Sequence, residues 1–167
     1  FEYNRYGELQ SVDDATTDYL YTYDDYGRLL REAVVTDSNT TEFIYTYNRY
    51  GKVSTVTAFI DGVEDFTNAY EYDFRGRIID LEQTGPNVIP KQVTFDYASD
   101  SLTIQRYEDG NLVVESTTEF SSLAGGLARR SDPLINVADI KGISHVDAQG
   151  NVLASHGYTH DETGLVD

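Results

Sequence analysis

Tyrosine pairs are the residues of this sequence best suited to binding a ligand. Two aromatic side chains separated by one polar residue recur along the chain, and a period of two places both rings on one face of a β-strand. Such a row of rings could stack on sugar rings or cradle a peptide. Alternatively, the rings pack across neighbouring strands, at about 0.2–1 kcal/mol per contact. Packing is favoured, because a repeat unit must contact its neighbours first. The candidate binding residues are Tyr21, Tyr23, Tyr45, Tyr47, Tyr70, Tyr72 and Tyr97.

Histidine offers a second candidate chemistry, metal binding. The histidines are His145, His156 and His160, and the last two are four residues apart, with Asp161 and Glu162 following. That spacing suits a metal on a helix, but this segment has the pattern of a strand, where such residues share a face and lie far apart. No zinc-type ligand spacing supports a site. We therefore expect surface histidines and no metal site, with His160 at the second aromatic position of a degenerate repeat.

Motifs for catalysis are missing from the sequence. It contains no G-x-S-x-G nucleophile turn, no phosphate-binding P-loop and no G-x-G-x-x-G fingerprint. Carboxylates are abundant, but sequence alone cannot place two of them about a glycosidic bond. The acidic pairs Asp13-Asp14 and Asp24-Asp25 lack the twelve-residue pattern of a calcium loop. We predict no catalytic residue and no cofactor.

An internal repeat positions the tyrosine pairs. Residues 1–9, 21–29, 45–53 and 70–78 align without gaps as aromatic-x-aromatic, Asp or Asn, two residues, glycine, one residue, aliphatic. The repeat glycines fall at positions 7, 27, 51 and 76. Weaker copies follow at 95–97 and 158–165. A tandem repeat is therefore the organising feature of the chain.

Each repeat has the chemistry of one β-hairpin. The Asp or Asn can accept a backbone N–H at the start of a turn, and the glycine supplies the positive φ of a type I turn closed by a bulge. Turn tyrosines 6, 26 and 50 should be exposed, and stacking between adjacent turns accounts for them. The residues between the paired aromatics are polar, as a solvent-facing side requires: Glu2, Thr22, Thr46, Glu71 and Asp96.

The links between hairpins predict the fold class. Segments 36–40 and 61–62 are short and polar, and links of this length join neighbouring antiparallel strands. Gly110-Asn111 and Gly150-Asn151 mark two further hairpin turns. We expect a single all-β domain over 1–167, an antiparallel meander of about a dozen strands. Because an aromatic face must be buried, the sheet should curl into a half-barrel or barrel-like form.

One stretch, 121–142, interrupts the repeat. It contains Gly125-Gly126, and Asp132 as N-cap, Pro133 at the first helical position and Gly142 beyond the end predict one short helix. We interpret it as an irregular insertion that could cover part of the sheet. The alternative is a functional loop, since long irregular connections often carry function.

The charge of the chain restricts its partners. The formal net charge is −17, from 29 acidic and 12 basic residues. A surface this acidic repels nucleic acid and anionic lipid, whereas it could attract cations or a basic protein. The sequence has no cysteine and no run of 18 apolar residues, so we expect no disulfide and no transmembrane helix.

The motif Y-x-Y-D-x-x-G-R-L at residues 21–29 resembles the tyrosine–aspartate repeat of Rhs and teneurin-type proteins, whose strands wind into a hollow shell. The length and acidity resemble small secreted or lipid-anchored Bacteroidetes proteins of unknown function with a porin-like curved sheet. The resemblance covers residues 1 to about 104 well. It implies a periplasmic or cell-surface location, with a lipid anchor upstream of Phe1, and it carries over no catalytic residue. Asp100-Ser101-Leu102 resembles the O-glycosylation acceptor of that phylum.

The function expected from these patterns is a non-enzymatic, extracytoplasmic structural or binding module for a glycan, peptide or protein partner. Two alternatives stay open. One is a carboxylate-based hydrolase that uses the 121–142 segment or a concavity of the sheet. The other is a fragment of a larger Rhs-like shell.

Overall fold

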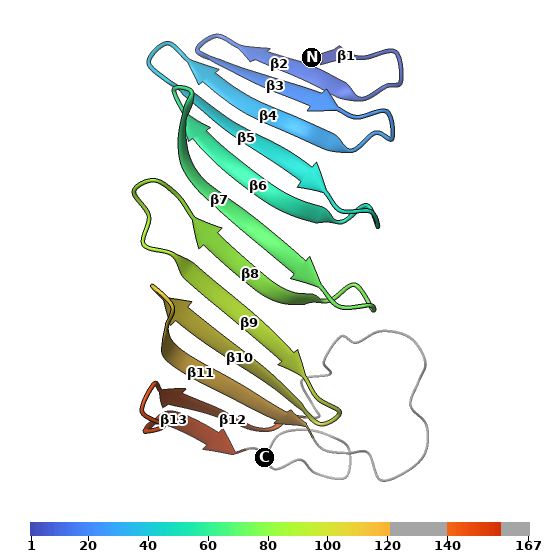
Figure 1. The fold of residues 1–167 in the computed structure, drawn as a ribbon. Coiled ribbons are helices and arrows are strands. Elements are labelled where there is room, and N and C mark those ends of the chain that lie inside the picture. The colour runs from blue at the N-terminus through green and yellow to red at the C-terminus, as the bar shows by residue number, and fades with distance from the viewer. Residues whose placement is uncertain (121–139, 158–167) are drawn as a thin grey trace. The chain divides into compact units, whose positions relative to one another are not determined.

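The computed structural model describes residues 1–120 and 140–157 of the 167-residue chain. These residues form thirteen β-strands, ordered in the sheet as they are in the chain (Figure 1). The strands are β1 (Glu2–Tyr3), β2 (Leu9–Asp14), β3 (Thr17–Tyr23), β4 (Leu29–Thr36), β5 (Thr40–Tyr47), β6 (Val53–Ile60), β7 (Val63–Tyr72), β8 (Ile78–Thr84), β9 (Lys91–Tyr97), β10 (Ser101–Glu108), β11 (Asn111–Phe120), β12 (Ile140–Asp147) and β13 (Val152–Gly157). The predicted all-β antiparallel meander is confirmed. The sheet is open, because β1 pairs only with β2 and β13 only with β12 in the strand order.

The predicted short helix lies outside the described residues, as does most of the 121–142 insertion. Gly142, expected beyond the end of that helix, lies in β12. Among the described residues, no helix is long and apolar enough to cross a membrane.

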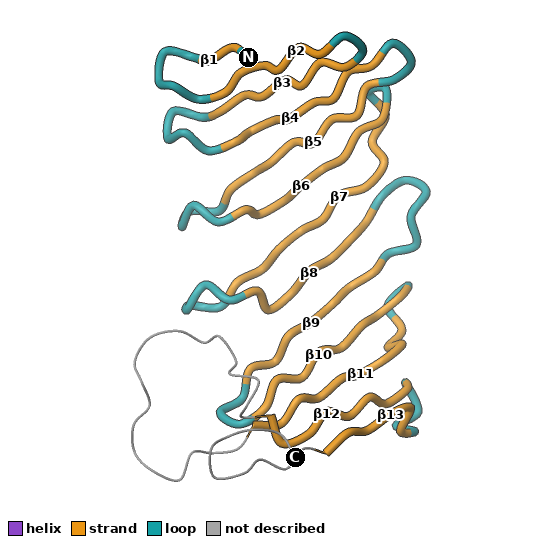
Figure 2. The backbone as a smooth tube through the Cα atoms, turned by 180° about the vertical axis from the view of Figure 1, so that it is seen from behind, coloured by secondary structure: helices purple, strands orange, loops and turns teal. Residues whose placement is uncertain are grey.

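The chain forms two compact units, Phe1–Gln92 and Val93–Asp167. The first unit contains β1 to β8 and the start of β9, and all four strong repeats. Its repeat turns lie at one end of the strands, and the short links lie at the other end (Figure 2). We call the first of these the repeat-turn end and the second the link end.

The repeat turns have the predicted geometry. In the second turn, the Gly27 N–H donates to the Asp24 carbonyl (3.0 Å) and the Asp24 N–H donates to the Arg28 carbonyl (2.9 Å). Gly27 has φ +77°, a conformation that a residue with a Cβ adopts only at a cost. The strand register shifts between Thr22 and Tyr23, as a bulge requires. The same backbone bonds close the other three turns.

Alternation of side chains gives the first unit an aromatic face and a polar face. On the aromatic face, Tyr45 lies opposite Val56 and Tyr70 opposite Leu81. On the polar face, the hydroxyls of Thr46 and Thr55 are 2.7 Å apart. The five polar residues predicted to face solvent are all exposed.

The sheet of the first unit is a single layer with little fully buried core. Among the described residues only Ala33 (1% exposed) and Ala58 (3%) are buried. The tyrosine pairs of β3, β5 and β7 are half-buried by their neighbours in the same sheet, whereas Tyr3 on β1 is 61% exposed. Stability therefore depends on contacts between adjacent hairpins rather than on a central core.

The second unit continues the hairpin pattern with β10 to β13. Gly110 (φ +74°) and Gly150 (φ +81°) lie in the two turns that the sequence predicted. In the latter turn, the Asp147 carboxylate accepts the N–H groups of Gln149 (2.9 Å) and Asn151 (2.8 Å).

Candidate ligand-binding groove at the repeat turns

The seven candidate tyrosines lie where the sequence placed them, each in a strand and each half-buried. Tyr21, Tyr23, Tyr45, Tyr47, Tyr70 and Tyr72 lie in the first unit, on β3, β5 and β7, and Tyr97 ends β9 in the second unit. In the first unit, five of the six tyrosines lie opposite an aliphatic residue on the following strand. The exception is Tyr21, which lies opposite Glu32. The role of the seven tyrosines in ligand binding stays a prediction.

The second tyrosine of a repeat bonds to the preceding repeat. The Tyr23 hydroxyl donates to the Leu9 carbonyl (2.9 Å), and the Tyr47 hydroxyl donates to the Leu29 carbonyl (2.6 Å). Desolvation is the largest cause of the raised pKa of both hydroxyls. These bonds join one hairpin to the next, which is a structural role that the repeat pattern alone did not reveal.

The first residue of each repeat turn organises the turn through its side chain. Asp73 Oδ1 accepts the N–H groups of Arg75 and Arg77, and its Oδ2 accepts from the Arg77 guanidinium at 2.7 Å. Desolvation would raise the pKa of Asp73, but these hydrogen bonds outweigh it and lower the pKa. Asp24 has the same arrangement with Arg28 and the same lowered pKa. The hydrogen bonds of each turn therefore favour the ionised form of its aspartate.

Exposed aromatic rings project from all four turns. Their exposed fractions are 71% for Tyr6, 86% for Tyr26, 73% for Tyr50 and 91% for Phe74. A guanidinium lies over each ring, at 4.7 Å for Arg5 on Tyr6, 5.4 Å for Arg28 on Tyr26, 4.7 Å for Arg49 on Tyr50 and 5.2 Å for Arg75 on Phe74. The sequence predicted the exposed turn tyrosines but not the cation beside each ring. Exposed aromatic and arginine side chains together are typical of binding surfaces.

A second set of cation–ring contacts connects consecutive repeats. Arg28 lies over the Tyr47 ring of the next repeat (4.4 Å), and Lys52 lies over Tyr72 (5.4 Å). The Lys52 side chain extends along the next turn so closely that a Cβ at Gly76 would lie 2.6 Å from Lys52 Cε. Absence of a side chain at Gly76 therefore leaves the space that Lys52 occupies.

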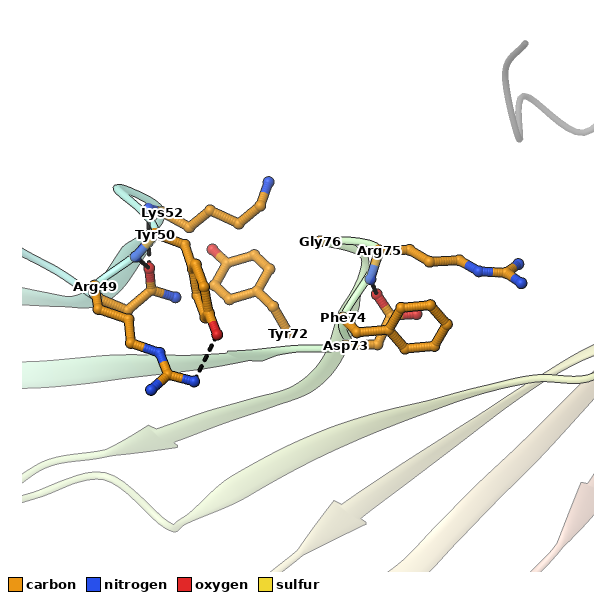
Figure 3. A pocket seen from close by; sticks show the side chains of 9 residues that line it. Arg49, Tyr50, Lys52, Tyr72, Asp73, Phe74, Arg75 and Gly76 are labelled. Atoms are coloured by element: carbon orange, nitrogen blue, oxygen red, sulfur yellow. Dashed lines mark hydrogen bonds between the residues drawn. The ribbon is translucent and has the colours of Figure 1, made fainter. Parts of the chain in front are cut away.

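The third and fourth turns enclose a groove of about 530 Å³ (Figure 3). Its lining combines aromatic rings, cations and one carboxylate, and comprises Asn48, Arg49, Tyr50, Lys52, Tyr72, Asp73, Phe74, Arg75 and Gly76. Figure 3 shows the Arg49 guanidinium bonded to the Tyr50 hydroxyl, a contact of 2.5 Å, and the Lys52 chain passing above Tyr72.

The groove is lined by several cations, although the protein as a whole is acidic. Half of the 12 basic residues lie in the four repeat turns: Arg5, Arg28, Arg49, Lys52, Arg75 and Arg77. The third and fourth turns together carry four cations and one carboxylate, whereas the first turn is neutral and the second is acidic by one charge. Arg49, Lys52 and Arg75 form no ion pair within the described part of the chain.

The link end of the first unit has the opposite charge. Segments 13–18, 35–40 and 59–66 carry seven acidic residues and no lysine or arginine: Asp13, Asp14, Asp18, Asp37, Asp61, Glu64 and Asp65. A smaller hollow of about 240 Å³ lies there, lined in part by Asp13, Asp14 and Asp18. The strands of the first unit thus separate their charges between their two ends.

Two of the three histidines, His145 and His156, lie among the described residues. His145 Nδ1 lies 2.8 Å from the Ser116 hydroxyl, and His156 is exposed on β13. His160, Asp161 and Glu162 lie outside the described residues. Across residues 1–120 and 140–157, no group of three His, Cys, Asp or Glu side chains is placed to hold a metal ion. Ser101 of the predicted glycosylation acceptor begins β10 and is half-buried.

Comparison with known proteins adds a likeness of fold. No protein-family model matches the sequence, and no curated protein matches it. Among solved structures, the chain is similar to the crystal structure of a porin-like protein from Bacteroides uniformis. The sequences are 18% identical, the match covers 98% of this chain and 77% of that chain, and the TM-score is 0.46. No conclusion about function follows from a likeness at this level.

Proposed function

We propose that the protein is a non-enzymatic binding module that recognises a polypeptide partner through its repeat-turn end. The observation that carries the proposal is the row of exposed turn rings, each with a guanidinium over it. Tyrosine and arginine are among the residues enriched in the energetically dominant contacts of protein interfaces. Rigid hairpins that present Tyr, Asn and Gly at their tips also have the composition of antibody binding loops.

The groove between the third and fourth turns is the centre of this proposed surface. Tyr50 and Phe74 supply apolar area on short, stiff side chains, which limits the entropy lost on binding. Arg49 and Arg75 add hydrogen-bond donors at the rim. A concave site with aromatic walls and a few polar groups has the form of a recognition site.

Binding is preferred to catalysis because of the state of the one carboxylate among the lining residues. Both oxygens of Asp73 accept hydrogen bonds within its own turn, and these bonds lower the pKa of its carboxyl group. A general acid needs the opposite, a carboxyl whose pKa is raised. Asp73 therefore suits a turn-forming role.

We further propose that the module acts outside the cytoplasm, in the periplasm or at the cell surface, either secreted or lipid-anchored. This part depends on the resemblance of the repeat motif. Fractionation of cells that express the full-length gene product tests it, and recovery in the cytoplasm would contradict it.

A peptide-display selection tests the recognition of polypeptides. Enriched peptides should bind the wild-type protein and lose binding to the Tyr50→Ala/Phe74→Ala variant. Val63→Ala is the control, because Val63 is an exposed apolar residue (67%) at the link end, away from the repeat turns. Failure to enrich any peptide, or equal loss with Val63→Ala, would refute the proposal.

The half-buried tyrosine row stays a rival surface for glycans. A glycan array with the wild type and with Tyr45→Ala and Tyr70→Ala variants tests it. Glycan signals that these variants abolish and that Tyr50→Ala/Phe74→Ala leaves unchanged would move the site to the aromatic face.

A further inference from the structure

We infer that the groove between the third and fourth repeat turns recognises an acidic segment of polypeptide, whose carboxylates pair with Arg49, Lys52 and Arg75. This inference rests on the proposed function and names the chemistry of the partner. It follows from three features of the described turns: the ion pairs that form within each turn, the local charge, and the residues that line the groove.

The first residue of each turn determines whether the cation four residues later forms an ion pair within that turn. In the second and fourth turns an aspartate bonds the arginine four residues later: Asp24 holds Arg28 at 2.6 Å, and Asp73 holds Arg77 at 2.7 Å. In the third turn the same position is Asn48, which is neutral, and the cation four residues later is Lys52. Asn48 keeps the turn bonds to backbone N–H groups (2.9 and 3.1 Å). The turn is therefore intact while its lysine has no carboxylate partner in the turn.

Local charge at the groove is positive although the protein is strongly acidic. The two turns sum to +3, from Arg49, Lys52, Arg75 and Arg77 against Asp73. Strands of eight residues such as β6 separate the groove from the link end by ~26 Å, and charges separated by more than about 8 Å are largely screened at physiological salt. A carboxylate that enters the groove meets these cations at close range, and the acidic link end at the other end of the strands is screened from it.

The occupant that fits is a short acidic segment of polypeptide. Tyr50, Tyr72 and Phe74 offer apolar surface to the aliphatic parts of a peptide, between the cations that would bind its carboxylates. An extended peptide directs alternate side chains to one side, so Glu or Asp at every second position can reach the cations together. A long polyanion would instead have to pass the carboxylates of a protein with a net charge of −17.

Fluorescence anisotropy with defined peptides tests the inference. The probe is a fluorescein-labelled (Glu-Ser)5 peptide, compared with (Gln-Ser)5 and with oligogalacturonate, which carries carboxylates on a sugar. We expect (Glu-Ser)5 to bind the wild-type protein at least tenfold more tightly than either competitor at about 50 mM salt. Equal binding of (Gln-Ser)5 would overturn the role of charge, and equal binding of oligogalacturonate would overturn the polypeptide class.

Two variants locate the interaction. Lys52→Gln should weaken (Glu-Ser)5 binding by about two- to fivefold, the range expected for one exposed charge pair. Lys91→Gln, which removes an equal charge from an exposed residue outside the repeat turns, should leave binding unchanged. Asn48→Asp should weaken binding as much as Lys52→Gln, because the new carboxylate would hold Lys52 as Asp24 holds Arg28.

Asn48→Asp keeps the side-chain oxygen that accepts the N–H groups of Tyr50 and Lys52, as Asp24 does in its own turn, so we expect the variant to fold. Unchanged affinity in both Asn48→Asp and Lys52→Gln would overturn the inference. Peptides from the display selection distinguish failure of this inference from failure of the proposed function. Enriched peptides that are neutral and still depend on Tyr50 and Phe74 would overturn the acidic preference and leave polypeptide recognition standing.

Discussion

Removal of one hydroxyl, in Tyr47→Phe, tests whether the repeats are joined by their second tyrosines. The Tyr47 hydroxyl donates to the Leu29 carbonyl at 2.6 Å, and the ring lies beneath Arg28 at 4.4 Å. The substitution keeps the ring and the Arg28 contact and deletes only the hydrogen bond. A net hydrogen bond is worth about 0.5–1.5 kcal/mol. We expect the free energy of unfolding to fall by that amount.

Urea unfolding measures the loss. With a denaturant slope of about 2 kcal/mol/M, a loss of ~1 kcal/mol lowers the unfolding midpoint by roughly 0.5 M. Tyr50→Phe is the matched control, because its hydroxyl accepts a bond from Arg49 at the surface and the residue is 73% exposed. That control should change stability by no more than about 0.5 kcal/mol. Equal midpoints for Tyr47→Phe and Tyr50→Phe would refute the inter-repeat role of Tyr47.

The alkaline limb of the stability curve tests the burial of the same hydroxyl. Burial is the largest cause of the raised pKa of Tyr47. The folded state therefore favours the neutral hydroxyl, and its contribution is complete below the ordinary tyrosine pKa of about 10 and is lost as the pH rises through the raised value. Tyr47→Phe should lose less stability than the wild type between pH 9 and pH 11. An identical loss in both proteins would contradict the assignment.

Two further predictions concern the turns. The lowered pKa of Asp24 and Asp73 means that their contribution is present above the ordinary aspartate pKa and is lost as the pH falls through the lowered value. An Asp24→Asn/Asp73→Asn variant should therefore lose less stability than the wild type between pH 6 and pH 3, and an equal loss would contradict this. Gly76→Ala and Gly51→Ala should each cost about 1–2 kcal/mol in urea unfolding, because both glycines have positive φ. Only Gly76→Ala should also weaken (Glu-Ser)5 binding, because its Cβ would displace Lys52; equal affinities of the two variants would contradict the placement of Lys52.

The sequence was sufficient to predict the meander and its turns, because these depend on local rules. A period of two fixed which side chains share a face, and the Asp or Asn to glycine spacing fixed the type I turn with its bulge. Gly27, with φ +77° and its bond to the Asp24 carbonyl, shows the predicted geometry. Long-range information was not needed, because each hairpin pairs with its neighbours in the chain.

The groove could not be predicted, because it depends on contacts between one repeat and the next. Lys52 and Tyr72 are 20 positions apart, and only the register of β5 to β7 brings the amine over the ring. In the sequence, Asn48 and Asp24 are equivalent as turn residues, since both form the same turn. The consequence of their difference appears once Arg28 is seen bound to Asp24, while Lys52 has an amide at the equivalent position. The signal in the sequence is the net charge of each repeat turn, which is positive only in the third and fourth turns.

Chemical-shift mapping tests the central claim, that the protein binds its ligand at the repeat turns. A peptide from the display selection is titrated into ¹⁵N-labelled protein, and the backbone amide shifts are followed. The account predicts that residues 48–52 and 73–77 shift first and most. Shifts concentrated on the tyrosine row of β3, β5 and β7, or at the acidic segment 13–18, would contradict it.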